Sequence, residues 1–307
     1  MARGLSVFDV SALSRVGSRG RAIALLVALL GGYGALPAGA GQDDDGSQSE
    51  VGPQQAAALP DSPNYNGLDY TRPQQSAELR LRFQTSSSPT SETDKEQMFL
   101  KVSTKVDLPE QWKLALLGQV QLADKQVTNF APPGTSGDAG LGDSVLQAAL
   151  IRTIDSHWAA GFGARLVSPT AEDSLGSGKW VIMPGAGVRY SFLEINPDTY
   201  FVPVLRWAMS FAGDPTRRRI NEPQIAPTFN IGLPDSWFVT FYPSNDIRIN
   251  FGDPIPGQTG RLFLPFDAGI GRSITEKITV MLEISVPMIK DYPVYDFKTE
   301  LRFAVKF

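Results

Sequence analysis

The sequence contains no cysteine and a single histidine, His157, among its 307 residues. The absence of cysteine excludes disulfide bonds, thiol nucleophiles, thiolate metal sites and the lipidated cysteine of a lipoprotein. One histidine cannot build a multi-histidine metal site, so we predict no metal and no cofactor. The net charge is −4, with both signs mixed along the chain, so no basic field points to a nucleic-acid partner.

Long hydrophobic runs are also missing. Beyond the N-terminal region, no stretch reaches the ~18 apolar residues that a transmembrane helix needs. In the N-terminal region itself, basic residues from Arg15 to Arg21 precede an apolar run at 22–30, and Ala38-Gly39-Ala40 follows. This order predicts a secretory signal peptide over residues 1–40, with cleavage after Ala40. The alternative is a buried core helix.

Residues 41–76 are rich in acidic residues, glutamine and proline and contain almost no β-branched residues. Such a composition buries too little apolar surface to offset the entropy lost on ordering. We predict a flexible periplasmic linker here. Entry of this segment into a barrel lumen as a plug is the alternative.

From residue 77 onward the hydrophobic pattern has a period of two instead of 3.6. Leu79, Leu81 and Phe83, for example, alternate with Arg80 and Arg82. Successive side chains of a strand point to opposite faces, so each such segment has one apolar and one polar face. Residues 77–307 are therefore predicted to be all-β, as a transmembrane antiparallel up-and-down β-barrel.

Twelve strands are predicted, and long and short connections alternate between them. The segment 237–251 is taken as one strand with a central irregularity, because its apolar residues keep the same parity across Pro243. Connections at 86–95 and 125–141 are among the long ones. The predicted strands are 76–85, 96–108, 112–124, 142–154, 157–168, 180–191, 199–212, 222–233, 237–251, 261–273, 277–287 and 296–307.

A soluble β-sandwich also alternates apolar and polar residues and is the structural alternative. Many of the predicted strands, however, reach the ~9 to 11 residues that cross a bilayer at a tilt. Aromatic residues recur near strand ends, as in interfacial girdles. Phe303, Val305 and Phe307 end the chain in the pattern of an assembly signal for the barrel assembly machinery. We therefore expect location in a bacterial outer membrane, with its lipid and lipopolysaccharide as partners.

The middle of the chain carries a family resemblance. Gly140-Leu141-Gly142-Asp143-Ser144 opens a strand, 161–170 forms a strand that ends in Pro-Thr, and the glycine-rich segment 175–180 precedes Pro184-Gly185-Ala186-Gly187. This pattern resembles the outer-membrane transporter family named for the meta-pathway of phenol degradation, although Ala171 stands where glycine is usual. The resemblance implies an outer-membrane β-barrel that transports a small molecule, and it does not identify the solute.

Gly176-Ser177-Gly178-Lys179 superficially matches a phosphate-binding loop. Trp180 follows the lysine where serine or threonine should bind magnesium, so a hairpin loop is the better interpretation. His157 lies beside the short turn Asp155-Ser156, and no G-x-S-x-G elbow accompanies it. We therefore predict no catalytic residues, and a membrane-embedded lipid hydrolase remains the weakest alternative.

Arg217-Arg218-Arg219 falls in a predicted external loop. Three adjacent guanidinium groups suit the phosphates of lipopolysaccharide or the steering of anions. A solvated loop without a ligand explains the run equally simply.

If the apolar parity faces lipid, charged residues of both signs line the lumen, with basic residues in excess. Such residues form either a pore that favours anions or a neutralising network that fills a narrow barrel. We keep both interpretations open. The predicted pore-lining residues are Arg80, Arg82, Lys101, Lys105, Arg165, Arg189, Arg206, Asp246, Arg248, Arg261, Asp267, Glu283, Lys298, Glu300 and Arg302.

The leading functional hypothesis is a channel for passive diffusion of small solutes, with anionic or aromatic organic compounds as candidate cargo. The second is a structural or adhesive outer-membrane barrel with a plugged lumen. Neither hypothesis makes the chain an enzyme.

Overall fold

The computed structural model describes residues 66–172, 174–244 and 246–307. The predicted signal peptide and residues 41–65 of the predicted linker lie outside the described residues. Within the described part, no helix is long and apolar enough to cross a membrane.

The described residues form fourteen β-segments in one antiparallel sheet, with one 3-10 turn, η2 (Pro234–Ser236), among them. The segments are β1 Ser76–Ser87, β2 Ser91–Asp107, β3 Trp112–Phe130, β4 Pro133–Leu141, β5 Ser144–Thr153, β6 Trp158–Ser168, β7 Lys179–Ser191, β8 Tyr200–Gly213, β9 Asn221–Gly232, β10 Trp237–Phe241, β11 Ile247–Ile249, β12 Leu262–Ser273, β13 Ile278–Lys290 and β14 Phe297–Lys306.

These segments make a closed barrel of twelve strands, as the sequence predicts. β4 and β5 both pair with β3 and together count as one strand. β10 and β11 both pair with β9 and β12, which confirms that 237–251 is one interrupted strand. β1 closes the barrel against β14 in a register that runs from Ser76↔Lys306 to Thr85↔Phe297.

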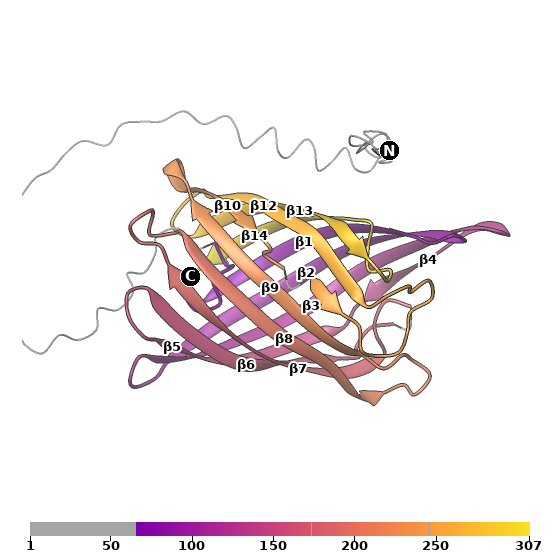
Figure 1. The fold of residues 1–307 in the computed structure, drawn as a ribbon, viewed down its shortest axis with the longest axis horizontal. Coiled ribbons are helices and arrows are strands. Elements are labelled where there is room, and N and C mark those ends of the chain that lie inside the picture. The colour runs from indigo at the N-terminus through magenta and orange to yellow at the C-terminus, as the bar shows by residue number, and fades with distance from the viewer. Residues whose placement is uncertain (1–65, 173, 245) are drawn as a thin grey trace, which may run out of the picture. The chain divides into compact units, whose positions relative to one another are not determined.

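The barrel has two distinct ends (Figure 1). The terminal end, where β1 begins and β14 finishes, carries the short turns 108–111, 154–157, 192–199, 233–236 and 274–277. At 108–111, Glu110 and Gln111 both have positive φ, of 57° and 63°. Such pairs of left-handed residues match the twist of hairpin strands. The loop end carries the connections 88–90, 131–132, 169–178, 214–220, 250–261 and 291–296.

Two predicted loops are wrong, because the structure has strand there. Residues 91–95 belong to β2. Most of 125–141 forms the last six residues of β3 and all of β4, a hairpin that projects from the loop end (Figure 1). The segment lacks an apolar face, and β4 is exposed along nearly its whole length. The two strands stay paired beyond the apolar belt. Their sequence there does not alternate apolar and polar residues, so it gives no sign of a strand.

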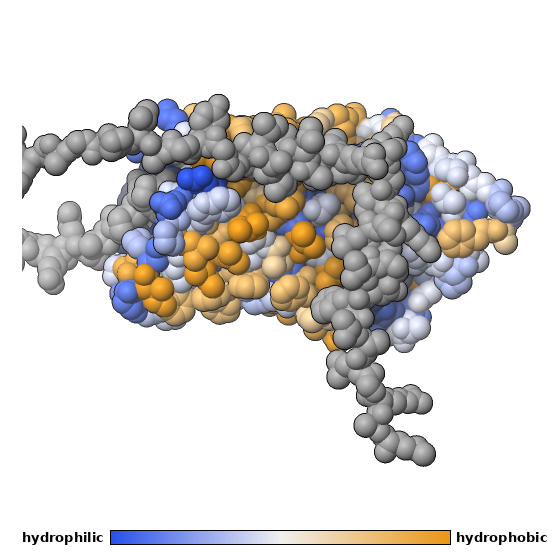
Figure 2. Space-filling model, turned by 90° about the horizontal axis from the view of Figure 1, so that it is seen from above, coloured by the Kyte–Doolittle hydropathy of each residue, from blue (hydrophilic) through white to orange (hydrophobic). Residues whose placement is uncertain are grey.

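Side-chain burial is inverted relative to a soluble protein. Large apolar side chains point outward and are exposed, among them Leu100, Phe162 and Leu205. The fully buried side chains include Lys298 and Glu300, which point inward. Figure 2 shows apolar residues along the middle of the visible face and hydrophilic ones toward its ends. This distribution is typical of a barrel with a lipid-facing exterior and a polar interior.

Candidate functional site

A dense ion network lines one half of the lumen. It spans β1, β2, β11, β12, β13, β14 and the junction between β10 and β11, where Asp246 lies. Six bases and five acids compose it, so its formal charge is close to neutral. We define the lumen ion network as Glu78, Arg80, Arg82, Lys101, Asp246, Arg248, Asp267, Glu283, Lys298, Glu300 and Arg302.

Lys298 is the centre of this network. Its Nζ lies 2.6 Å from Asp246 Oδ2 and 3.7 Å from Asp267 Oδ2, and it also contacts Glu283. Its side chain is 0% exposed. A buried charge that loses its partner is costly, so these groups depend on one another.

The interruption between β10 and β11 brings Asp246 to this centre. Tyr242 adopts a positive φ of 52° at the break. Beyond it, Ser244 Oγ donates a hydrogen bond of 2.8 Å to Glu283 Oε1, and Arg248 Nη2 lies 2.7 Å from Asp246 Oδ1. The irregularity that the sequence shows at Pro243 therefore carries polar groups inward onto the network.

Three acids of the network come close enough together to suggest a cation site. One carboxylate oxygen each of Asp246, Asp267 and Glu283 lie within 4.8 Å of one another. The Lys298 ammonium already contacts all three carboxylates. The side chain of Lys298 thus supplies the positive charge that a metal ion would bring.

The opposite wall of the lumen carries Arg165 on β6 and Arg206 on β8, which we call the arginine pair. Neither has a carboxylate partner among the residues that the structure describes. Arg165 Nη2 donates to Gln147 Oε1 at 2.8 Å, and Arg206 Nη2 donates to Gln224 Oε1 at 3.0 Å. Each glutamine is directly opposite its arginine in the strand register. Amide oxygens satisfy hydrogen bonds but do not neutralise charge, so this wall keeps a positive charge.

The arginine pair also has unused donors. Arg206 Nε is buried and has no hydrogen-bond partner among the described residues. The charges of Arg165, Arg248 and Arg80 repel that of Arg206, whereas the Asp246 carboxylate attracts it. Gly185 on β7 makes room for Arg206, because a Cβ at Gly185 would lie 3.0 Å from Arg206 Cγ and 2.8 Å from the Leu205 carbonyl oxygen.

Residues 66–72, which we call the lumen strap, lie against the inner wall near the terminal end. Asn66 Nδ2 donates to Asn230 Oδ1 on β9 at 2.9 Å. Arg189 Nη1, on β7, lies 2.8 Å from Asp69 Oδ2. From there the chain reaches Ser76 at the start of β1. In the closed barrel β1 lies opposite β7, so the segment crosses the lumen. These residues belong to the predicted linker 41–76, whose earlier part is not described.

Glycines on the inner face make room for the lumen strap. An added Cβ at Gly187 would lie 2.4 Å from the Tyr70 hydroxyl oxygen, and one at Gly161 would lie 3.1 Å from the Tyr70 ring. The partners of the strap were not found from the sequence, because Asp69 and Arg189 are 120 positions apart. Uncharged Gln147 and Gln224 escaped notice for a different reason, since they carry no charge signal.

The connection 169–178 is hydrogen-bonded to the barrel wall at the loop end. Asp143 accepts hydrogen bonds of 2.9 Å from both the amide N–H and the hydroxyl of Ser177. Lys95 Nζ donates to the Leu175 carbonyl oxygen at 3.3 Å. The structure thus joins two parts of the family-like pattern, the G-L-G-D segment and the glycine-rich loop. Gly176-Ser177-Gly178 lies in the connection between β6 and β7, not in a phosphate-binding loop.

Three remaining pore candidates lie away from the ion network and the arginine pair. Arg189 is 0% exposed and bound to Asp69. Lys105 faces Asp107 at 3.9 Å, near the end of β2. Arg261 is exposed at the loop end, with its guanidinium carbon 5.3 Å from the centre of the Phe251 ring.

His157 has the surroundings of a turn residue. Its Nδ1 lies 2.9 Å from the Ser191 carbonyl oxygen, and its ring stacks on Tyr190. Asp155 accepts hydrogen bonds from the amide N–H groups of Trp158 and His157, which lower the pKa of its carboxyl. No serine hydroxyl contacts the ring within the described residues.

The arginine run at the loop end is paired internally. Arg217 lies 3.9 Å from Asp214, Arg219 lies 4.0 Å from Asp253, and Arg218 contacts Glu222. Each guanidinium thus has an acidic neighbour on this chain. These pairs make the arginine run less available to bind a phosphate group of lipopolysaccharide.

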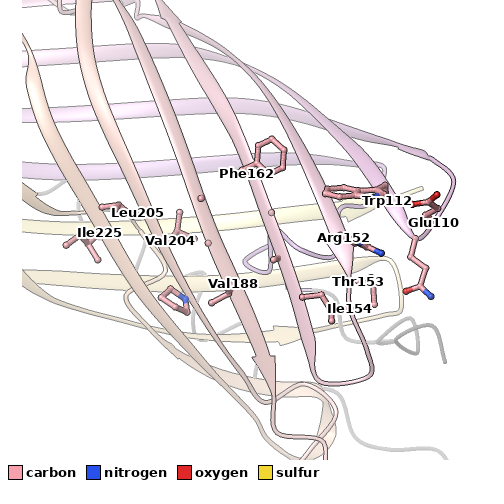
Figure 3. Close-up of a pocket in the computed structure, with 16 residues that line it drawn as sticks. Glu110, Trp112, Arg152, Thr153, Ile154, Phe162, Val188, Val204, Leu205 and Ile225 are labelled. Atoms are coloured by element: carbon pink, nitrogen blue, oxygen red, sulfur yellow. The ribbon is translucent and has the colours of Figure 1, made fainter. Parts of the chain in front are cut away.

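The outer surface carries a groove of about 1160 Å³ near the terminal end (Figure 3). Mainly apolar, outward-facing side chains line it. Arg152 and Glu110 lie at one end, where the Arg152 guanidinium carbon is 5.7 Å from the centre of the Trp112 ring. The lining includes Glu110, Trp112, Arg152, Ile154, Ala160, Phe162, Ala186, Val188, Pro203, Leu205 and Ile225.

The last strand turns its apolar residues outward. Phe303 is 42% exposed and Phe307 is 67% exposed, with Val305 partly buried between them. Their use as an assembly signal stays a prediction.

Comparison with solved structures supports the fold. The chain is similar to an outer-membrane channel from Pseudomonas putida F1, with 15% identity, a TM-score of 0.59, and coverage of 84% of this chain and 100% of that one. Weaker likenesses include the KdgM porin (9% identity, TM-score 0.44, 76% and 99% coverage) and the transport unit of the autotransporter AIDA-I from Escherichia coli (9%, 0.46, 78% and 92%). No family model and no curated protein matches the chain. The fold is that of an outer-membrane-type β-barrel.

Proposed function

We propose that this chain is an outer-membrane channel for the passive diffusion of small solutes and that it prefers anions. The arginine pair carries the proposal, since Arg165 and Arg206 have amide partners in place of carboxylates. A wall with uncompensated positive charge lowers the energy of an anion beside it and raises that of a cation.

The charge distribution of the lumen supports this preference. The lumen ion network holds one more base than acid, and the arginine pair adds two further positive charges. A fixed positive charge of this kind selects solutes by the sign of their charge and does not recognise their shape. Carboxylate-bearing organic compounds are therefore the proposed cargo.

The proposed location is a bacterial outer membrane, reached through the predicted signal peptide 1–40. The outward apolar band and the polar lumen support it. We also propose membership of the outer-membrane transporter family named for the meta-pathway of phenol degradation. The contact of Asp143 with Ser177 supports this, because it joins two separate parts of the family-like pattern.

A selectivity measurement in planar bilayers tests the channel proposal. The Arg165→Gln/Arg206→Gln variant should shift the zero-current potential in a KCl gradient toward cations. Arg272→Gln is the matched control, because Arg272 lies near the outer Trp237 ring and donates to the Asp235 carbonyl oxygen. Equal shifts in the two variants, or none in either, would contradict the role of the arginine pair.

The second candidate function, a structural or adhesive barrel, is favoured by one observation. The lumen strap crosses the interior near the terminal end and is bonded to β7 and β9. If the full chain shows no conductance in salt of any concentration, the plugged barrel replaces the channel. The contacts of His157 offer nothing to support a lipid hydrolase.

A further inference from the structure

The outer groove near the terminal end has an apolar body and one charged end (Figure 3). Its volume of about 1160 Å³ is at the upper end of the ~300–1,000 Å³ typical of small-molecule sites. Ala160 on β6 and Ala186 on β7 are small residues on its floor, while Phe162 and Leu205 are large and exposed beside them. The hollow therefore arises from small side chains among large ones on the outward face.

The two charged residues at its end have opposite signs and free charges. Within 66–172, 174–244 and 246–307, neither Arg152 nor Glu110 has an ion-pair partner. The Arg152 guanidinium lies over the face of the Trp112 ring, where a cation is favourably placed. Glu110 is exposed in the turn 108–111, whose left-handed residues fix its position.

The groove also runs from the rim of the barrel into its wall. Trp112 is the first residue of β3, at the terminal rim. Ile225, at the other end of the lining, precedes Gly232, the last residue of β9, by seven positions. Tryptophan at a barrel rim is typical of the membrane interface. The charged end thus lies where lipid headgroups are found, and the apolar body lies at the depth of acyl chains.

We propose that the groove binds one zwitterionic glycerophospholipid of the ethanolamine type. The Arg152 guanidinium pairs with the lipid phosphate, and the Glu110 carboxylate accepts hydrogen bonds from the ethanolamine ammonium. The acyl chains occupy the apolar body between Phe162 and Leu205. This charge pattern favours an ethanolamine headgroup over a glycerol headgroup, which has no ammonium for Glu110. The inference rests on the proposed membrane location but not on conduction.

Lipid retention by the purified full-length chain tests the site. The protein is incubated in detergent with equal amounts of phosphatidylethanolamine and phosphatidylglycerol of matched acyl chains, separated by gel filtration, and analysed by native mass spectrometry. We expect one retained lipid per barrel, mainly phosphatidylethanolamine. Arg152→Gln should weaken binding of both lipids about tenfold, the effect of one charge-assisted hydrogen bond. Glu110→Gln should abolish the preference between them.

A matched pair of substitutions tests the acyl-chain part of the groove. Ala160→Leu fills the floor and should reduce retention of lipid. Ala164→Leu, on the same outward face of β6 but outside the groove, should leave retention unchanged. Heat-modifiable mobility on gels confirms that each variant is folded.

Four results would overturn the proposal. Equal retention of the two lipids by the unsubstituted chain removes the headgroup assignment. Equal retention by Ala160→Leu and Ala164→Leu removes the groove assignment. A dimer that Ala160→Leu converts to monomer, measured by light scattering, makes a second copy the occupant. A chain that conducts ions but retains no lipid refutes this site and leaves the channel proposal intact.

Discussion

Removal of the ammonium at the centre of the lumen ion network should destabilise the barrel strongly. In Lys298→Met the side chain keeps similar length but loses its charge. Lys298 is 0% exposed and contacts Asp246, Asp267 and Glu283, so three clustered carboxylates lose their shared cation. Loss of one partner from a buried pair costs about 3–5 kcal/mol. We expect a loss of that size in the free energy of unfolding.

The assay is reversible unfolding of the full chain in lipid vesicles, followed by tryptophan fluorescence and by gel mobility. Lys290→Met is the matched control, because the Lys290–Asp296 pair is partly exposed, at 25% and 35%. Exposed pairs contribute at most about 1 kcal/mol. The double variant Lys298→Met/Asp267→Asn should recover part of the loss, because among the described residues Asp267 has its ion pair with Lys298, whereas Asp246 and Glu283 also pair with Arg248 and Arg302.

A small effect would refute the reasoning. If Lys298→Met loses no more stability than Lys290→Met, the network is hydrated and the three carboxylates do not depend on the ammonium. A double variant that is no more stable than Lys298→Met would show that the Asp267 carboxylate does not depend on the ammonium.

Three further predictions concern other parts of the lumen. Asp143→Ala removes three hydrogen bonds from the connection 169–178, so protease cleavage of this connection should become faster; an unchanged rate would show that Asp143 does not hold it. Gly185→Ala places a Cβ 2.8 Å from the Leu205 carbonyl oxygen and should cost about 1–3 kcal/mol in unfolding measurements; a neutral result would mean that β7 shifts freely. Asp69→Asn removes the carboxylate charge that faces buried Arg189 and should increase single-channel conductance if the lumen strap limits flow, whereas unaltered conductance would separate the strap from the conduction path.

Much of the fold was predictable because an outer-membrane-type barrel repeats one simple pattern. Each strand has to face lipid on one side and the lumen on the other, so alternation such as Leu79–Arg80–Leu81–Arg82 predicts both the strand and its facing. The same parity identified 237–251 as one strand despite Pro243. The extension of β3 and β4 was missed, because a strand outside the apolar belt needs no apolar face.

The sequence predicted which charged residues face the lumen, but it did not predict which of them form ion pairs. Parity places Lys298 and Glu283 on the inward face, and the structure joins them into one network. Parity does not say which inward charges meet, since that depends on barrel closure and on the break between β10 and β11, which brings Ser244 and Asp246 to the network. The charge imbalance at Arg206 became visible only when Gln224 was identified as its partner.

The most direct test of the central claim is chemical modification of one lumen position during current recording. The chain has no native cysteine, so Arg206→Cys introduces a unique thiol, and Leu205→Cys, whose side chain is outward and 52% exposed, is the control. A cationic thiol reagent added to the bath should change the current of Arg206→Cys and restore its anion preference, while it leaves Leu205→Cys unaffected. Modification that alters the current of Leu205→Cys but not of Arg206→Cys would contradict an anion path along the arginine pair.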